Sequence, residues 1–332
     1  MALQALTIGD TVTDAFIKLL DDRAITYENE QGKWLAMPYG MKIPFEKAEV
    51  IEGVGNAANA AVSLARLGIH TGLISNVGAD TFGRNIVDAL EAERVDTRFV
   101  RINNKKKTNY HYVLWYKDER TILINHEEYN YQWPRFTKTD IPEWIYFSSI
   151  SKNALEKYHD YVADWLEDNP QVKLAFNPGT YQMEAGIDKL HRIYSRTEVL
   201  VLNREEAVYV TGGSYDDIHD LMNRFHKLGV KIVVITDGPA GAYASDGENR
   251  YKMPLYPDPA PPYERTGAGD AFASTFVAAI MKGNNIEGAL QWAPINSMNV
   301  VQYVGAQQGL LKESEIEELL KNAPEWYKPE RF

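Results

Sequence analysis

The stretch Thr266-Gly267-Ala268-Gly269-Asp270-Ala271-Phe272-Ala273-Ser274 carries the strongest structural signal in this chain. It opens an apolar helical pattern that runs to about Met281 and ends at Gly283. Two glycines allow the backbone to approach a ligand, and free N–H groups at a helix N-terminus attract an anion. Asp270 is then placed to accept a proton from an attacking hydroxyl. The alternative is a Gly-rich turn whose aspartate only favours the positive helix end.

Outward from this stretch, apolar strand patterns alternate with helical patterns. The strand patterns cover residues 3–8, 71–75, about 98–102, 144–147, 172–176, 198–202 and 231–236, and the first helical patterns cover about 57–67 and 82–94. This βαβ patterning predicts an α/β fold with a doubly wound, mostly parallel sheet flanked by helices.

Two excursions interrupt the alternation. Residues 25–52 carry a Pro38/Gly40 turn, and residues 103–125 contain two extended stretches around a turn at 117–119. We expect these segments to form a small β-sheet lid over an α/β domain made of residues 1–24, 53–102 and 126–332. Such a lid would cover the carboxyl ends of the strands, where ligands bind. Because the lid is too slight to bury both of its faces, we also expect a homodimer assembled through it.

Composition excludes several classes of protein. The 332 residues carry 46 Asp and Glu against 35 Lys and Arg, a net charge of −11, which gives no electrostatic footprint for nucleic acid. The absence of cysteine excludes disulfides and thiolate sites. No basic, apolar leader or membrane-length apolar run is present, so we expect a cytoplasmic protein with no membrane partner.

Five motifs occur in the order found in the ribokinase-like (PfkB) carbohydrate kinases, which this chain resembles along nearly its whole length. They are the glycine stretch at 266–274, a first signature at 55–68, a GxDxFG turn at 78–83, an NxxE motif at 203–206 and a TxGxxG element at 236–241. The resemblance implies a phosphotransferase that uses ATP and Mg²⁺ to phosphorylate a hydroxyl group of a small sugar. It assigns Asp270 as the catalytic base, and Gly267, Ala268 and Gly269 as the anion hole.

The resemblance also implies the binding residues. Asp14, Gly55 and Asn59 would bind the acceptor. Asn203 and Glu206 would help to hold magnesium, with Glu206 acting through water, although Asn followed three residues later by Glu is also a capping box that needs no ligand. The remaining positions implied for the nucleotide site are Thr236, Gly238 and Gly241.

The chain departs from the family pattern at several positions. Val54 stands where a second glycine is usual, and Glu264-Arg265 replaces Asp-Thr, which puts a monovalent-cation site in doubt. Asn177-Pro178-Gly179 replaces the commoner Asp-Pro-Asn. Pro294 falls inside a helical pattern, where it should cost about 3 kcal/mol or force a kink.

Other functions have weaker support. Residues 53–58 fit G-x-G-x-x-A, but the acidic residue that a nicotinamide-dependent dehydrogenase needs at the end of the next strand is replaced by Asn76. A non-catalytic sugar sensor would not need an intact Asp270. Among acceptors, a free ketose or pentose leads, and a nucleoside or a sugar phosphate is the alternative.

Overall fold

The main sheet is built from strands that lie far apart in the sequence. The computed structural model describes residues 3–30, 32–117 and 119–332. Its main-sheet strands are β1 (Ala5–Ile8), β6 (Thr71–Gly78), β7 (Val100–Asn103), β10 (Trp144–Phe147), β11 (Lys173–Phe176), β12 (Thr197–Asn203), β13 (Ile232–Thr236), β14 (Ala242–Ser245), β15 (Arg250–Met253) and β16 (Glu330–Arg331). Within the described chain their order is β16-β15-β14-β13-β12-β11-β10-β1-β6-β7. From β7 to β13 all neighbours are parallel, and the last three strands are antiparallel.

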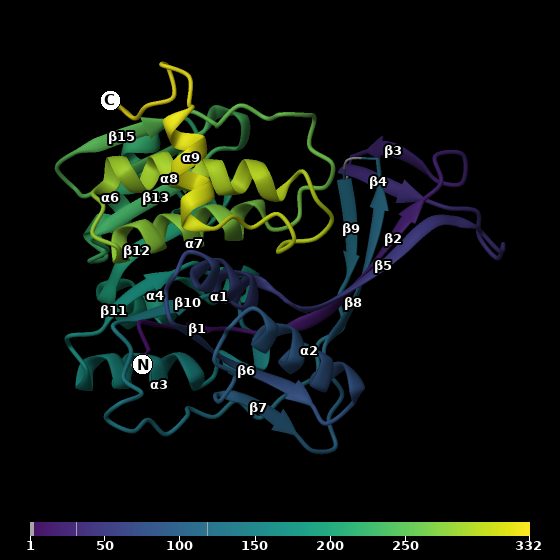
Figure 1. Cartoon of the computed structure of the whole chain (residues 1–332), viewed down its shortest axis with the longest axis horizontal. Coiled ribbons are helices and arrows are strands. Elements are labelled where there is room, and N and C mark those ends of the chain that lie inside the picture. The colour runs from purple at the N-terminus through teal and green to yellow at the C-terminus, as the bar shows by residue number, and fades with distance from the viewer. Residues whose placement is uncertain (1–2, 31, 118) are drawn as a thin grey trace.

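Helices cover both faces of this sheet (Figure 1). Alternate strand residues enter opposite cores: Val199 and Val201 pack on one side, and Leu200 and Leu202 on the other. The first core includes α1 (Asn56–Arg66), α7 (Ala268–Met281), α8 (Ile286–Val300) and α9 (Glu313–Lys321). The second includes α3 (Tyr158–Asp168), α4 (Thr180–Arg196), α5 (Arg204–Thr211) and α6 (Ile218–Lys227), while α2 (Thr81–Ala92) packs near β6. Burial on both faces explains the continuous apolar strands and confirms the predicted doubly wound fold.

A separate four-stranded sheet stands to one side of the body (Figure 1). It contains β2 (Val12–Leu19), β5 (Phe45–Val54), β8 (Tyr110–Tyr116) and β9 (Glu119–Leu123), and a hairpin of β3 (Ile25–Asn29) and β4 (Gly32–Ala36) extends from it. Strand β2 precedes the segments predicted for the lid. The sequence pattern did not separate β2 from β1, because an apolar stretch continues directly after the bend at residues 9–11. Of the predicted turn at 117–119, Asp118 lies outside the described residues.

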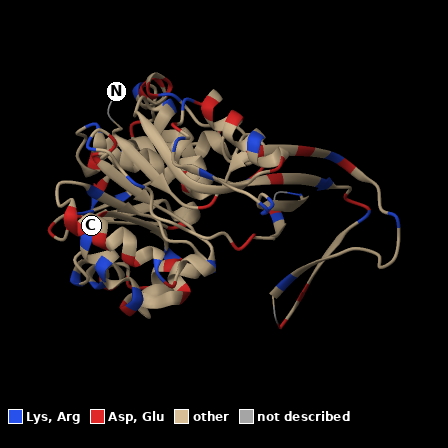
Figure 2. Cartoon of the chain, turned by 90° about the horizontal axis from the view of Figure 1, so that it is seen from below, with Lys and Arg blue, Asp and Glu red and all other residues tan. Residues whose placement is uncertain are grey.

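The small sheet closes onto the body through one of its faces. Phe16 and Val113, which are cross-strand neighbours, pack with Val304 from the segment after α8. The Trp115 ring meets the Tyr263 ring edge to face, with centroids 4.9 Å apart. We call this the inner face of the small sheet. Figure 2 shows the sheet projecting from the body, with acidic and basic residues interspersed over the side in view.

Two further findings bear on the sequence expectations. Helix α8 runs through Pro294, so the proline does not end the helix. Within the described residues, no helix combines the length and apolar character that a membrane crossing needs.

Candidate active site

The glycine stretch lies at the start of α7, where the chain turns sharply. Gly267 precedes the helix with a φ of 82°, and a side chain there would lie 2.4 Å from the Cβ of Ala306. At Gly269 the space that a Cβ would occupy is open. The first N–H groups of an α-helix have no partner within the helix. The N-terminus of α7 therefore offers N–H donors that the helix itself does not satisfy, beside open space, which suits an anion.

A buried carboxylate fixes the entry to this stretch. Glu264 is 1% exposed, and its Oε1 accepts hydrogen bonds from Thr266 N at 2.8 Å and Thr266 Oγ1 at 2.6 Å. Its Oε2 accepts one from the backbone N–H of Gly305 at 3.3 Å. Glu264 thus ties the segment before α7 to the segment after α8, at a position where the sequence departs from the family pattern.

The carboxylate of Asp270 faces the start of α1. Its Oδ1 accepts a hydrogen bond from Asn56 Nδ2 at 3.0 Å, and its Oδ2 accepts one from Asn59 Nδ2 at 2.7 Å. Asn59 is held in turn, because its Oδ1 accepts from Gln307 Nε2 at 3.0 Å. The same Gln307 nitrogen donates to Gly53 O at 2.7 Å. Residues more than 200 positions apart in the sequence therefore fix the orientation of this carboxylate.

The electrostatic environment makes Asp270 a better base. Burial raises the pKa of its carboxyl to about 6 from the ordinary 3.8, the hydrogen bonds from Asn59 and Asn56 oppose this rise, and the negative charge of Glu206 adds to it. A carboxyl group with a pKa near neutrality is common among catalytic acids and bases.

Of the residues implied for acceptor binding, Asp14 lies in β2 and is 8% exposed. Gly55 is the N-cap of α1 and has a φ of 111°. Its backbone packs closely on Asp10, because a side chain at Gly55 would lie 2.8 Å from the carbonyl oxygen of Asp10. Asn59 contacts Asp270, as described above. The fold therefore brings the start of α1, with Gly55 and Asn59, against Asp270 at the start of α7. Asp14 lies on β2, which pairs with the strand that leads into α1.

Asn203 and Glu206 form a capping box at the start of α5. Asn203 Oδ1 accepts from Glu206 N at 2.8 Å, and Glu206 Oε2 accepts from Asn203 N at 2.9 Å. Burial raises the pKa of Glu206. Among the described residues, no group of three or more His, Cys, Asp or Glu side chains is arranged to hold a metal ion. Mg²⁺ typically keeps several waters and uses one or two carboxylates together with substrate phosphates, so this single carboxylate fits an ion held largely by other ligands.

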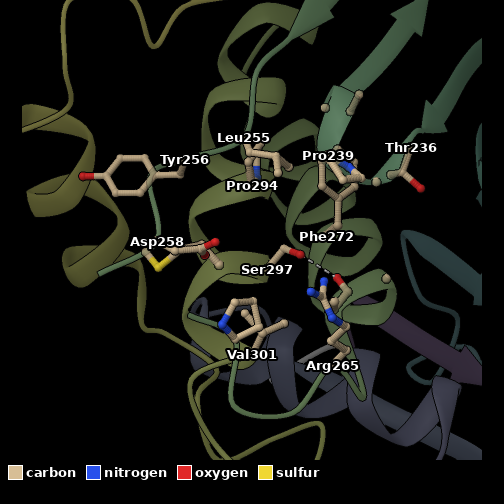
Figure 3. A pocket seen from close by; sticks show the side chains of 17 residues that line it. Thr236, Pro239, Leu255, Tyr256, Asp258, Arg265, Phe272, Pro294, Ser297 and Val301 are labelled. Carbon is tan, nitrogen blue, oxygen red and sulfur yellow. Dashed lines mark hydrogen bonds between the residues drawn. The ribbon is translucent and has the colours of Figure 1, made fainter. Parts of the chain in front are cut away.

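A cavity of about 220 Å³ opens beside the glycine stretch. Thr236, Gly238 and Gly241 line it, together with Ala268 and Gly269. Figure 3 shows Pro239, Leu255, Phe272 and Pro294 among the side chains around it, so much of its wall is apolar. Gly241 has a φ of 93°, and a side chain there would lie 2.1 Å from the carbonyl oxygen of Met253. Such a cavity fits a ligand with a flat apolar ring, whose anionic group would lie at the N-terminus of α7.

Some residues of this region were not predicted from the sequence. Arg265 lines the cavity, and Ser297 Oγ donates to Ala268 O at 3.0 Å, which fixes α8 against α7 (Figure 3). Gln307 and His111 also lie near the residues predicted to bind ligands. Ser297, Gln307 and His111 fall in no motif and carry no sequence signal that would identify them. Arg265 stands at a position that departs from the family pattern, but its place in the cavity wall depends on the fold.

Comparison with known proteins gives a consistent result. The family described as pfkB family carbohydrate kinase matches residues 49–313. A cytidine kinase of Thermococcus kodakarensis is 30% identical over 241 residues, covering 70% of this chain and 82% of that protein. An ATP-dependent 6-phosphofructokinase of Thermoanaerobacterium thermosaccharolyticum is 26% identical over 267 residues, covering 76% of this chain and 80% of that protein.

The solved structures agree on the fold. The structure of Arabidopsis thaliana ribokinase complexed with ribose and ATP superposes with a TM-score of 0.76 and 22% identity, covering 97% of this chain and 99% of the other. At this level of identity the likeness establishes the ribokinase-like fold. The acceptors named for these three proteins differ, being a nucleoside, a sugar phosphate and a free sugar.

Proposed function

Because the chain belongs to the pfkB family of carbohydrate kinases, we propose that it transfers the γ-phosphoryl group of ATP to a hydroxyl group of a small free sugar, with Asp270 as the base. The observation that carries this proposal is the position of Asp270. Its carboxylate lies at the N-terminus of α7, oriented by two asparagines, next to a cavity that suits a nucleotide.

The chemistry follows from the charges that change during transfer. The acceptor oxygen bonds to the γ-phosphorus while its proton passes to a carboxylate oxygen of Asp270, and the bond to the β-phosphate oxygen breaks to release ADP. Phosphoryl transfer depends mainly on positioning and charge stabilisation. The unpaired N–H groups at Gly267, Ala268 and Gly269 are placed to stabilise negative charge on the phosphoryl oxygens. Arg265 adds the charge of a guanidinium to the same cavity.

The nucleotide would occupy the cavity between Thr236, Gly238 and Gly241 on one side and α8 on the other, with its phosphates toward α7. Mg²⁺, when bound with the nucleotide, would neutralise phosphate charge. Glu206 is the residue of this chain that would hold the ion, through water, while Asn203 keeps the Glu206 side chain in place.

The acceptor site favours an uncharged ligand. Among the described residues, Asp14 lies 3.3 Å from His111 and makes no ion pair with a lysine or arginine. An acceptor that already carried a phosphate would bring negative charge toward this carboxylate. A free ketose or pentose is therefore the leading acceptor. The 30% sequence identity with a cytidine kinase makes a nucleoside the alternative.

We further propose that the segments 25–52 and 103–125, together with β2, act as a lid and pair with a second copy of the chain. The face of the small sheet opposite the inner face exposes apolar side chains: Val50 is 50% exposed, Tyr112 49% and Leu123 52%. Exposed apolar surface on a small sheet favours association.

The direct test measures ADP formation from MgATP with a panel of D-ribose, D-fructose, their phosphate esters, and cytidine. We expect turnover above the ATPase background with at least one of the free sugars. Background rates with every acceptor, from protein that binds ADP, would refute the proposed reaction.

A further inference from the structure

A chain of polar contacts connects the main sheet to the inner face of the small sheet. Asp10 Oδ2 accepts a hydrogen bond from Ser151 N at 2.7 Å, and Ser151 Oγ lies 3.1 Å from His126 Nδ1. The His126 ring stacks on the His111 ring, with centroids 5.0 Å apart and planes 13° from parallel. His111 Nδ1 lies 3.3 Å from Asp14 Oδ1. The proposed transfer step uses neither histidine.

These contacts lie where the small sheet joins the body. Asp14 and His111 are cross-strand neighbours in the parallel pair of β2 and β8, which Figure 1 shows side by side. Two residues further along the same face, Phe16 packs on Val304, close to the segments that flank α7 and α8. In the other direction, Asp10 packs against Gly55, the residue before α1. The Asp14–His111 pair thus lies between the small sheet's contact with the body and the start of α1.

Two buried atoms of this pair have no hydrogen-bond partner in the part of the chain that the structure describes: Asp14 Oδ1 and His111 Nε2. The contact of Asp14 with His111 is therefore too poorly aligned to satisfy the carboxylate oxygen. Native proteins pair nearly all their buried polar atoms, and a buried group that lacks a partner needs an explanation. A bound ligand is the simplest explanation here, because the family resemblance implies that Asp14 binds the acceptor.

The two unpaired atoms indicate the kind of group that would satisfy them. Asp14 Oδ1 accepts hydrogen bonds, and a ring nitrogen such as His111 Nε2 accepts or donates according to its tautomer. Groups that both donate and accept hydrogen bonds therefore match this pair on adjacent strands.

A third unpaired atom adds a donor. Asn109 directly precedes β8 and lies two residues before His111. Its Oδ1 accepts from the backbone N–H of Glu127 at 2.8 Å, which identifies Nδ2 as the remaining amide atom, and Nδ2 is buried without a partner among the described residues. A hydroxyl group both donates and accepts, so neighbouring hydroxyls match this mixed set.

We propose that Asp14 and His111 together bind two neighbouring hydroxyl groups of an uncharged polyol acceptor, and that His126 is a positioning residue that holds the His111 ring by stacking. Asn109 Nδ2 donates to one of the bound hydroxyls. The inference rests on the proposed function and deepens it, because it makes His111 a specificity-determining residue and names a free diol-bearing sugar, in preference to its phosphate ester, as the substrate class.

The experiment compares His111→Ala, His111→Asn and His126→Ala with wild type and with His191→Ala, which removes an exposed histidine of α4. Each protein is assayed with the best of D-ribose and D-fructose, its phosphate ester, and its deoxy analogues that each lack one hydroxyl. Thermal melts establish that each variant is folded. Histidine Cε1–H NMR signals are followed while the free sugar is added without ATP.

We expect His111→Ala to raise the KM for the sugar about 10- to 100-fold, the range for losing a hydrogen bond within a charged pair, with the KM for ATP unchanged. His126→Ala should raise the sugar KM less, and His191→Ala should leave it unaltered. In wild type, the deoxy analogue that lacks the hydroxyl bound by His111 should have a higher KM than the full sugar. In His111→Ala the same analogue and the full sugar should have similar KM values, because the hydroxyl has already lost its partner. The free sugar alone should shift the His111 and His126 signals.

The outcomes separate this inference from the proposed reaction. Sugar turnover with an unchanged sugar KM in folded His111→Ala and His111→Asn would overturn the inference and leave the kinase reaction standing. A better KM for the phosphate ester than for the free sugar would overturn it as well. Shifted histidine signals without any phosphoryl transfer would support the binding site and refute the proposed reaction.

Discussion

Replacing Asp270 by asparagine removes the proposed base while keeping the size and shape of the side chain. In the structure, both carboxylate oxygens accept hydrogen bonds from asparagine amides, at 2.7 and 3.0 Å. Asp270→Asn puts an NH₂ group where one oxygen was, so one of these two donors then faces another donor. A buried donor left without its acceptor costs about 1–3 kcal/mol.

A second effect on stability has the opposite sign. Burial raises the pKa of Asp270 to about 6 from 3.8, so the native state binds this proton more tightly than the unfolded chain does. Folding is therefore favoured by this group at low pH, and the contribution is lost as the pH rises from about 4 through 6. At 1.36 kcal/mol for each pKa unit, the ionised carboxylate costs about 3 kcal/mol of native stability at pH 7. Asparagine relieves this cost.

The two effects nearly cancel, so we expect Asp270→Asn to unfold within about 2 kcal/mol of wild type at pH 7. Turnover should fall by about 10² to 10⁴, the usual loss for a general base. The assay measures kcat at saturating MgATP and sugar, together with thermal melts at pH 4, 5, 6 and 7 with and without ADP. The stability of Asp270→Asn relative to wild type should rise across this pH range.

A matched control is Asp160→Asn, which changes another first-turn aspartate, in α3, whose carboxylate lies 3.8 Å from Lys189. It should lose at most about 1 kcal/mol of stability and keep full turnover. If folded Asp270→Asn also turned over at a near-normal rate, Asp270 would be only a favourable charge at a helix end, and the proposed mechanism would be wrong.

Three other predictions follow from the same structure. Because Asp270 must be ionised to accept a proton, kcat should fall about tenfold per pH unit below about pH 6 and level off above it, as a pH profile at saturating substrates will show. Glu264→Ala should destabilise the protein by about 2–4 kcal/mol in denaturant titrations, because the donors at Thr266 and Gly305 lose their acceptor. The same change should raise the KM for ATP. An unchanged unfolding midpoint would contradict the role given to Glu264. Leu123→Lys places a charge on the exposed apolar face of the small sheet. Light scattering at micromolar protein should show a dimer for wild type and a monomer for this variant. A monomeric wild type would rule out the proposed pairing.

Local sequence patterns predicted the main sheet well, and long-range contacts limited what they could say about the site. The apolar runs at 144–147 and 231–236 are strands because both of their faces are buried, and this requires no knowledge of the neighbours. The contact of Asn59 with Asp270 depends on α1 and α7 packing together, and nothing within either helix encodes it. The sequence placed Asn59 near the acceptor, whereas its side chain orients the Asp270 carboxylate in this structure.

The histidines show the same limit more clearly. His111 and His126 lie fifteen positions apart and show no ligand-like spacing, so their positions in the chain offer no reason to group them. They meet because β9 folds back along β8 and the following segment returns past the inner face of the small sheet. Strand β2 was missed for a related reason: its residues become a separate sheet only because β5 and β8 arrive beside them.

The position of β1 in the main sheet has a consequence for how the chain is made. This strand begins at Ala5, and it pairs with Thr71 of β6 on one side and Trp144 of β10 on the other. On the ribosome, β1 emerges first, but one of its edges has no neighbour until more than 140 residues have been synthesised. Pairings over such long sequence separations form slowly, and an unpaired strand edge promotes association with other chains. Of the main-sheet strands that the structure describes, β1 is therefore translated before all the others, yet it keeps an unpaired edge until β10 emerges.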